Sequence, residues 1–232
     1  MGPVRMPERA VLLKSRPARI VLHDFLAGPD VEPVLEEQMG DIDESAPALT
    51  TPQEWRGYLR EYNELYLRAA EDDELDSGQN WMGNEPAAEE TVLAAEKRLG
   101  VRFPPSYRAF LLASDGWNGV GGWIELIWSC ERIPWMRDTG GGANLIDLYG
   151  EDPDDEYAVL FRRSLDVAEG EDFWFLDPAE VGPEGEWAAY LFEPKYGELK
   201  EFASFAELFH ASRRLMEWFA GTTLPTTESA RL

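Results

Sequence analysis

The fold is constrained most by the stretch from Glu90 to Asn118, which reads ETVLAAEKRLGVRFPPSYRAFLLASDGWN. Apolar residues recur in it at helical spacing as far as Gly100, a residue type that adopts the left-handed conformation with which many helices end. The double proline Pro104-Pro105 then interrupts the helix, because a proline disfavours the helical conformation of the residue before it. It can also open a second helix, since the first turn does not need the missing N–H. The stretch therefore predicts two helices, at about 86–99 and 105–114, followed by a small polar loop.

Composition and charge narrow the class of protein. The 232 residues include 44% hydrophobic residues and nine tryptophans, which is enough for one sizeable core. The formal net charge is -24, from 45 acidic residues against 21 lysines and arginines. Such a field repels nucleic acid and anionic membranes and favours basic partners. It equally suits a surface that only keeps the protein soluble, so charge alone leaves both interpretations open.

Few residues are suited to catalysis or metal binding. The single cysteine, Cys130, cannot form an internal disulfide, which indicates a reducing compartment, and the apolar run before it is typical of a buried structural thiol. The two histidines, His23 and His210, are far apart, so no zinc-ligand spacing occurs. No long apolar run indicates a signal peptide or a membrane span. We therefore expect a cytoplasmic protein that is not an enzyme and has no cofactor.

The first 50 residues differ from the rest of the chain. Residues 1–23 carry five basic residues against one acid, Glu8, and residues 24–50 are acidic and contain prolines. We interpret 1–50 as a basic arm and a linker, with one short helix at Val34–Met39. The arm either stays separate or folds onto the acidic body. Contact between this arm and nucleic acid is disfavoured by the charge of the whole chain.

The remaining sequence predicts one domain at 51–220 and a tail at 221–232. Thr51 and Glu54 form a capping box around a first-turn proline, and apolar residues at helical spacing then predict a helix to about Ala70. This helix is the N-terminal extension of the domain.

Short aromatic-rich segments after the second helix predict strands, because turn residues separate them. The predicted strands are Trp123–Trp128, Leu145–Tyr149, Tyr157–Phe161, Phe173–Leu176 and Trp187–Phe192, with a short sixth one at Leu199–Phe202. A second capping box, Ser204 with Glu207, opens a last helix that ends near Ala220. Helices first, then strands and a closing helix indicate an α+β fold with a mostly antiparallel sheet of about five to six strands.

An acidic turn is the densest group of potential ligands. Asp152, Asp154, Asp155 and Glu156 crowd around Pro153. Closely spaced carboxylates can bind calcium, but this run lacks the glycine and the distant glutamate of an EF-hand. A solvated acidic turn is therefore favoured, and an enzyme that uses carboxylates or a metal is a weaker alternative.

Two further features lie beside turns. Gly140-Gly141-Gly142 is interpreted as a flexible loop, because neither the lysine nor the helix of a phosphate-binding loop follows it. Trp81, Trp117 and Trp123 adjoin loops, so partial exposure is an alternative to burial in the core. Exposed tryptophans at a loop would favour contact with another protein.

The order of these residues resembles the SUKH superfamily, which includes a fungal cell-wall-synthesis regulator and many bacterial immunity proteins. The resemblance covers about 81–219 and lies in the segments Glu96–Gly100, Phe103–Arg108, Phe110-Leu111, Asp172–Asp177, Trp187–Glu193 and Phe202–Leu208. The chain departs from the family at Phe103, where leucine is usual, and in the loop Asp115–Gly119, where two equivalents of the usual Asn-Gly compete.

The resemblance implies a curved, mostly antiparallel sheet flanked by helices, and a protein that binds other proteins without catalysis. Bacterial members commonly neutralise polymorphic toxins, often nucleases, and an acidic chain suits the basic cleft of a nuclease. The expected partner is a basic toxin domain rather than nucleic acid or membrane, with an endogenous partner of a regulatory or scaffold protein as the alternative. Charge and expected exposure suggest as contacts Asp115, Trp117 and Asn118 in one loop and Asp152, Asp154, Asp155 and Glu156 in another.

Overall fold

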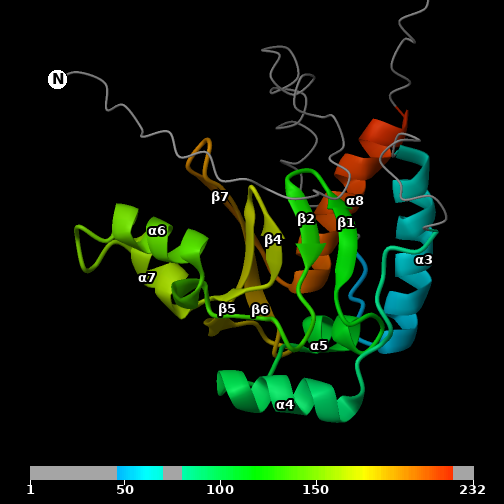
Figure 1. Cartoon of the computed structure of the whole chain (residues 1–232), viewed down its shortest axis with the longest axis horizontal. Helices are drawn as coiled ribbons and strands as arrows, with labels where there is room; N and C mark the ends of the chain where they lie inside the picture. Colours follow the sequence, from blue (N-terminus) through cyan, green and yellow to red (C-terminus); the bar gives the residue numbers. More distant parts are fainter. Residues whose placement is uncertain (1–45, 70–79, 222–232) are drawn as a thin grey trace, which may run out of the picture.

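The computed structural model describes residues 46–69 and 80–221 (Figure 1). The helices are α3 (Pro52–Ala69), α4 (Glu89–Leu99), α5 (Pro105–Leu111), α6 (Gly140–Tyr149), α7 (Glu156–Arg163) and α8 (Phe205–Gly221), with a short 3-10 helix, η1 (Met136–Asp138). The strands are β1 (Trp117–Gly121), β2 (Ile124–Ile127), β3 (Leu165–Asp166), β4 (Ala168–Gly170), β5 (Phe173–Val181), β6 (Trp187–Glu193) and β7 (Glu198–Phe202). The basic arm, the helix expected at Val34–Met39 and residues 222–232 of the tail lie outside the described residues.

The strands form two antiparallel sheets, which confirms the predicted α+β class. The first sheet has the order β1-β2-β4 and the second has the order β3-β5-β6-β7. They meet at Val167, whose N–H donates to the carbonyl of Trp174 at 2.9 Å and whose carbonyl accepts from the N–H of Trp128 at 3.0 Å. The chain thus passes from one sheet into the other without a loop.

The helix boundaries follow the capping residues. In the predicted capping box, the N–H of Thr51 donates to Glu54 Oε2 at 2.8 Å and the N–H of Glu54 donates to Thr51 Oγ1 at 3.3 Å. Gly100 closes α4 with a φ of 73°, as its residue type predicts. Helix α5 begins at Pro105, the second proline of the pair, as expected and ends at Leu111, three residues before the predicted boundary at 114.

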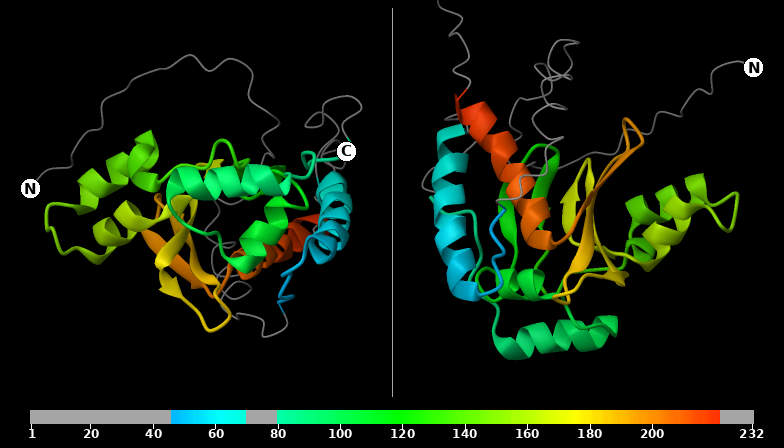
Figure 2. Two further views of the ribbon diagram at one scale, coloured as in Figure 1. Left: turned by 90° about the horizontal axis from the view of Figure 1, so that it is seen from below. Right: turned by 180° about the vertical axis from the view of Figure 1, so that it is seen from behind.

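The second sheet is covered on both faces. Successive side chains of a strand point to opposite faces, so neighbouring residues of one strand enter different clusters. In β5, Trp174 and Leu176 belong to the main core with helices α3, α5 and α8, whereas Phe175 packs with helices α6 and α7. Figure 2 shows α3 and α8 together on one side and the α6–α7 pair at the opposite end. At the centre of the main core the indole N–H of Trp55 donates to the carbonyl of Ser106 at 2.9 Å.

Two of the predicted strands are helices in the structure. Leu145–Tyr149 lies in α6 and Tyr157–Phe161 lies in α7. Each helix has an N-cap, since Thr139 accepts from the N–H of Gly142 at 3.0 Å and Asp155 accepts from the N–H of Ala158 at 2.9 Å. Short apolar runs fit either period, and here residues four apart share the buried side.

Two glycine-rich segments also differ from expectation. The triplet Gly140-Gly141-Gly142, interpreted as a loop, is the first turn of α6, where a side chain at Gly142 would meet the carbonyl oxygen of Met136 at 2.1 Å. The segment Trp117–Gly121, expected as a loop, is strand β1. Its glycines allow close packing, because a side chain at Gly121 would meet Met216 Sδ at 2.2 Å.

Candidate functional site

The first predicted contact group, Asp115, Trp117 and Asn118, spans the end of the loop after α5 and the start of β1, and its side chains serve the fold. Asp115 is half-buried, and its Oδ1 accepts from the backbone N–H of Cys130 at 2.7 Å. Asn118 is exposed, but its side-chain amide and its backbone N–H both donate to the carbonyl of Met82, at 3.0 and 2.9 Å. These bonds fix the loop against the segments on either side.

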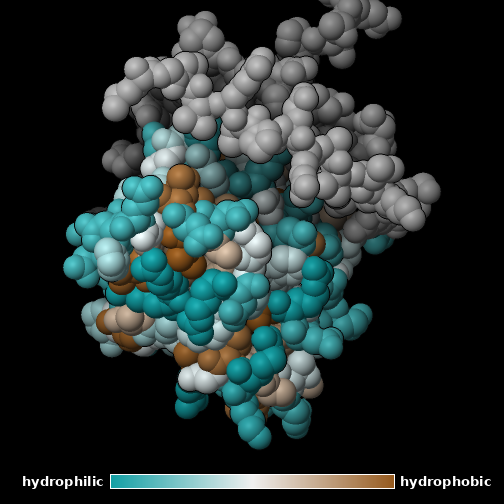
Figure 3. Space-filling model, turned by 60° about the vertical axis from the view of Figure 1, so that its left-hand side comes forward, coloured by the Kyte–Doolittle hydropathy of each residue, from teal (hydrophilic) through white to brown (hydrophobic). Residues whose placement is uncertain are grey.

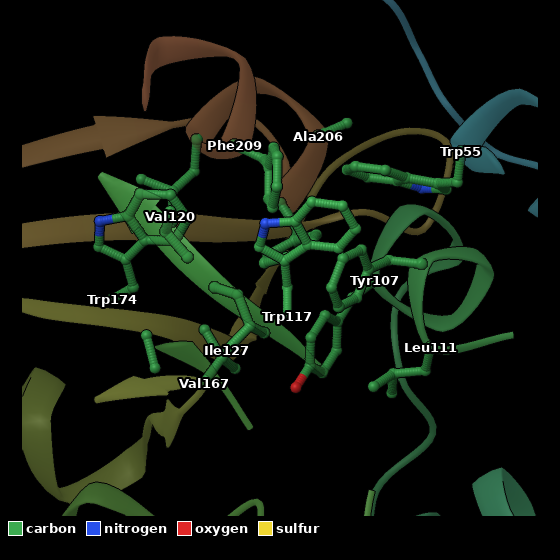
Figure 4. Close-up of a cluster of buried hydrophobic side chains, with 14 of the residues drawn as sticks. Trp55, Tyr107, Leu111, Trp117, Val120, Ile127, Val167, Trp174, Ala206 and Phe209 are labelled. Atoms are coloured by element: carbon green, nitrogen blue, oxygen red, sulfur yellow. The ribbon is translucent and has the colours of Figure 1, made fainter. Parts of the chain in front are cut away.

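Trp117 is fully buried, so the first of the two alternatives, burial in the core, holds for it and it is not available as a contact. Its ring lies edge-on to Trp81, with centroids 5.1 Å apart, and to Tyr62 at 6.3 Å. Figure 4 shows the indole enclosed among core side chains that include Phe209. The alternative of partial exposure holds for the other two tryptophans, since Trp81 is 39% exposed and Trp123 is half-buried.

The acidic turn between α6 and α7 is the second predicted contact, and most of it faces solvent. Asp152, Asp154 and Glu156 are exposed, and Asp155 is half-buried. Asp152 Oδ1 accepts from the backbone N–H of Asp154 at 3.0 Å, and Asp155 caps α7. The carboxylates of Asp154 and Glu156 form no hydrogen bond or ion pair within the described ranges. The positive end of the α7 dipole favours anions at this point, which offsets part of the repulsion among the clustered carboxylates.

Charge is segregated on the α6–α7 hairpin. The hairpin has two basic residues, Arg162 and Arg163, both in the last turn of α7. Before them, between Thr139 and Phe161, the sequence contains six carboxylates and neither lysine nor arginine: Asp147, Glu151, Asp152, Asp154, Asp155 and Glu156. Helices α3, α4 and α8 instead mix acidic and basic residues along their lengths. The hairpin therefore presents the most one-sided charge among the described helices.

The hairpin packs against the second sheet. The rings of Tyr149 and Tyr157 stack with centroids 5.1 Å apart, and Phe161 lies edge-on to Phe192 at 5.1 Å. Arg163 Nε donates to Oδ2 of the fully buried Asp177 at 2.8 Å, which joins the end of α7 to β5. The acidic turn is thus held at a fixed place by packing beneath it.

The two predicted contact groups do not meet. In Figures 1 and 2 the turn between α6 and α7 lies at the end of the molecule opposite α3, well away from the start of β1. Asp152, Asp154, Asp155 and Glu156 therefore belong to one surface, and Asp115 and Asn118 belong to another. Sequence reasoning missed that Asp147 and Glu151 extend the first surface, because it placed Asp147 on a strand.

The described residues offer no group of three or more side chains of the metal-binding types close enough to hold an ion. Cys130 is buried as expected, and burial raises the pKa of its thiol, which makes thiolate chemistry unfavourable. The Nδ1 of His210 lies 2.9 Å from the hydroxyl of Tyr58. Among the described helices, none is long and apolar enough to cross a membrane.

Comparison with known families identifies one match. The sequence profile of the SMI1/KNR4 family (SUKH-1) matches residues 86–211, which is more than half of the chain. The matched segment includes both sheets, the α6–α7 hairpin and the first part of α8. Helix α3 lies outside the match although Trp55 and Tyr62 place it in the main core. A search of curated proteins finds no match.

Proposed function

Because the chain belongs to the SMI1/KNR4 (SUKH-1) family, we propose that it is an immunity protein that neutralises a basic, nuclease-type toxin domain by binding it. The family match supports a protein-binding module of immunity or regulatory type. The observation that favours a basic partner is the segregation of carboxylates on the α6–α7 hairpin.

The physical reason lies in the substrate of a nuclease. A nuclease cleft must attract phosphates, so it presents lysines and arginines. Carboxylates held on the packed hairpin can occupy such a cleft in place of the phosphates. Opposite charge also accelerates association and makes it sensitive to salt. A complex of standard size would bury about 1,600 Å² in total.

The contacts assigned to this interaction follow from exposure. Asp152, Asp154 and Glu156 are the exposed members of the acidic turn, and Asp155 supports them as the cap of α7. Asn118 is exposed on the separate second surface. Trp117 has no place in the contact, because its side chain is enclosed in the core.

Rescue from intoxication tests the proposal. Cells would express the C-terminal toxin domain of a secreted protein encoded beside this gene, with or without this chain. Survival that depends on the chain is the expected result. Death in both cases would refute the immunity function, and capture of a protein from the host cell instead would support the regulatory alternative.

A further inference from the structure

The outward side of the α6–α7 hairpin combines exposed apolar residues with the carboxylates described above. Leu148 on α6 is 70% exposed and Val159 on α7 is 37% exposed. We call this surface the hairpin face and define it by Asp147, Leu148, Glu151, Asp154, Glu156 and Val159, all of them exposed. Figure 3 brings this end of the molecule forward and shows hydrophobic residues among hydrophilic ones.

The exposure of Leu148 follows from helix geometry. Leu145, Ile146 and Tyr149 form the side of α6 that turns toward the core, and Leu148 lies about 100° around the helix from Tyr149, which places it outside that side. Leu148 is the most exposed large apolar residue among those described, ahead of Val181 at 56% and Leu93 at 50%. An apolar side chain of this size gains most from being covered by another protein.

The surrounding charges specify what can cover it. The hairpin has two cations of its own, Arg162 and Arg163 in the last turn of α7, and Arg163 is paired with Asp177. Six carboxylates still outnumber them, so a partner that supplies cations suits this surface. Exposed ion pairs each contribute little affinity, whereas an apolar anchor at the centre of an interface contributes much. The carboxylates therefore guide the approach and the apolar residues hold the complex.

We propose that the hairpin face docks a basic amphipathic segment of a partner protein, with apolar side chains over Leu148 and Val159 and lysines or arginines against Asp154 and Glu156. The sign of the partner's charge rests on the proposed function as well as on the face itself. Leu93 offers a comparison for Leu148, because it is also exposed on a helix, α4, but is followed by Lys97 and Arg98, whereas Leu148 is followed by Glu151 and Asp152.

Nuclear magnetic resonance of the isotope-labelled full chain tests this docking. The probe is a short synthetic helix with leucine on one side and lysine on the other, and its control is a peptide of the same charge with serine in place of leucine. We expect shifts concentrated at Asp147–Val159 with the first peptide and much weaker binding of the second. Leu148→Gln should weaken binding about tenfold, and Leu93→Gln should leave it unchanged.

Several outcomes would overturn the proposal. Shifts spread over α3, α4 and α8, equal binding of both peptides, or equal effects of the two variants would each show that only net charge matters. If the chain self-associates through Leu148, or if substitution of Arg16 in the basic arm shifts the resonances of the hairpin face, the segment that covers the face belongs to this protein and not to a partner.

The rescue assay separates this inference from the proposed function. If Leu148→Gln rescues cells as well as the unchanged chain, the hairpin face is not the docking site although the immunity function holds. If the leucine-lysine helix binds the face but the unchanged chain fails to rescue, the immunity function is wrong and the docking surface stands.

Discussion

Asp115 Oδ1 accepts a hydrogen bond of 2.7 Å from the backbone N–H of Cys130. This bond ties the loop after α5 to the segment that follows β2, although the loop's charge and position had suggested a partner contact. The carboxylate is therefore occupied within the fold. Of the two predicted contact groups, only the acidic turn has exposed carboxylates, those of Asp152, Asp154 and Glu156.

Removal of the Asp115 carboxylate should destabilise the protein without weakening partner binding. Asp115→Ala leaves the N–H of Cys130 without its acceptor, which costs about 1–3 kcal/mol for a buried donor. Urea unfolding measures the loss, and Asp154→Ala serves as the control because its carboxylate is exposed. Equal stability of the two variants would contradict the structural role of Asp115.

Trp117 and Trp81 should differ strongly in their contribution to stability. Trp117→Ala creates a large cavity in the core and should cost about 3–5 kcal/mol. Trp81→Ala removes a ring that is 39% exposed and lies edge-on to Trp117. Such an aromatic pair contributes about 0.5–1.5 kcal/mol beyond the area that it buries. Thermal unfolding of both variants checks the order, and a larger loss at Trp81 would mean that Trp117 is not buried as described.

The carboxylate of Asp155 should stabilise α7 rather than contact the partner. Asp155→Ala removes the acceptor for the N–H of Ala158 and should cost about 1 kcal/mol, as for other N-caps. Asp155→Asn, which can also cap a helix, should retain most of the stability. If the alanine and asparagine variants unfold at the same urea concentration, the capping hydrogen bond does not account for the contribution of Asp155 to stability.

Two buried carboxyls should make the protein less stable as the pH rises from about 4 to about 7. Burial raises the pKa of Asp166 and that of Asp172 from 3.8 to about 7. Within this range the folded state binds more protons than the unfolded state, so raising the pH favours unfolding until both groups are ionised. Above this range their contribution to the slope vanishes.

The variant Asp166→Asn/Asp172→Asn isolates this contribution. Its amides stay neutral, so its free energy of unfolding should fall less between pH 5 and pH 8 than that of the unchanged chain, with about 1.4 kcal/mol per pH unit for each proton difference. Urea titrations at the two pH values give both slopes. Parallel curves would show that these carboxyls titrate normally.

The sequence predicted the elements whose signals are local. The capping box at Thr51, the glycine at 100 and the double proline act within a few residues, and the structure has these helix boundaries close to where they were expected. The aromatic-rich runs Phe173–Leu176 and Trp187–Phe192 likewise identified β5 and β6, and they are apolar throughout because each strand is covered on both faces. Such patterns need no knowledge of distant segments.

The errors concern features that depend on distant contacts. Leu145–Tyr149 and Tyr157–Phe161 are short apolar runs that fit a strand or a helix, and only their packing against one another and against β5 and β6 makes them helices. Trp117 adjoins a loop in the sequence, but Trp81 from a separate segment covers it. The acidic turn was identified correctly as a turn, whereas its extension to Asp147 required the helix.

The most direct test measures how strongly the purified toxin domain encoded beside this gene binds charge variants of this chain. Asp154→Lys/Glu156→Lys reverses two carboxylates on the hairpin face, and Glu64→Lys/Glu90→Lys makes the same change in charge at exposed residues of α3 and α4. We predict that the first variant binds at least about tenfold more weakly than the second and that its affinity varies less with salt. Equal affinity of the two variants, or binding by the unchanged chain that is insensitive to salt, would contradict recognition through the acidic hairpin.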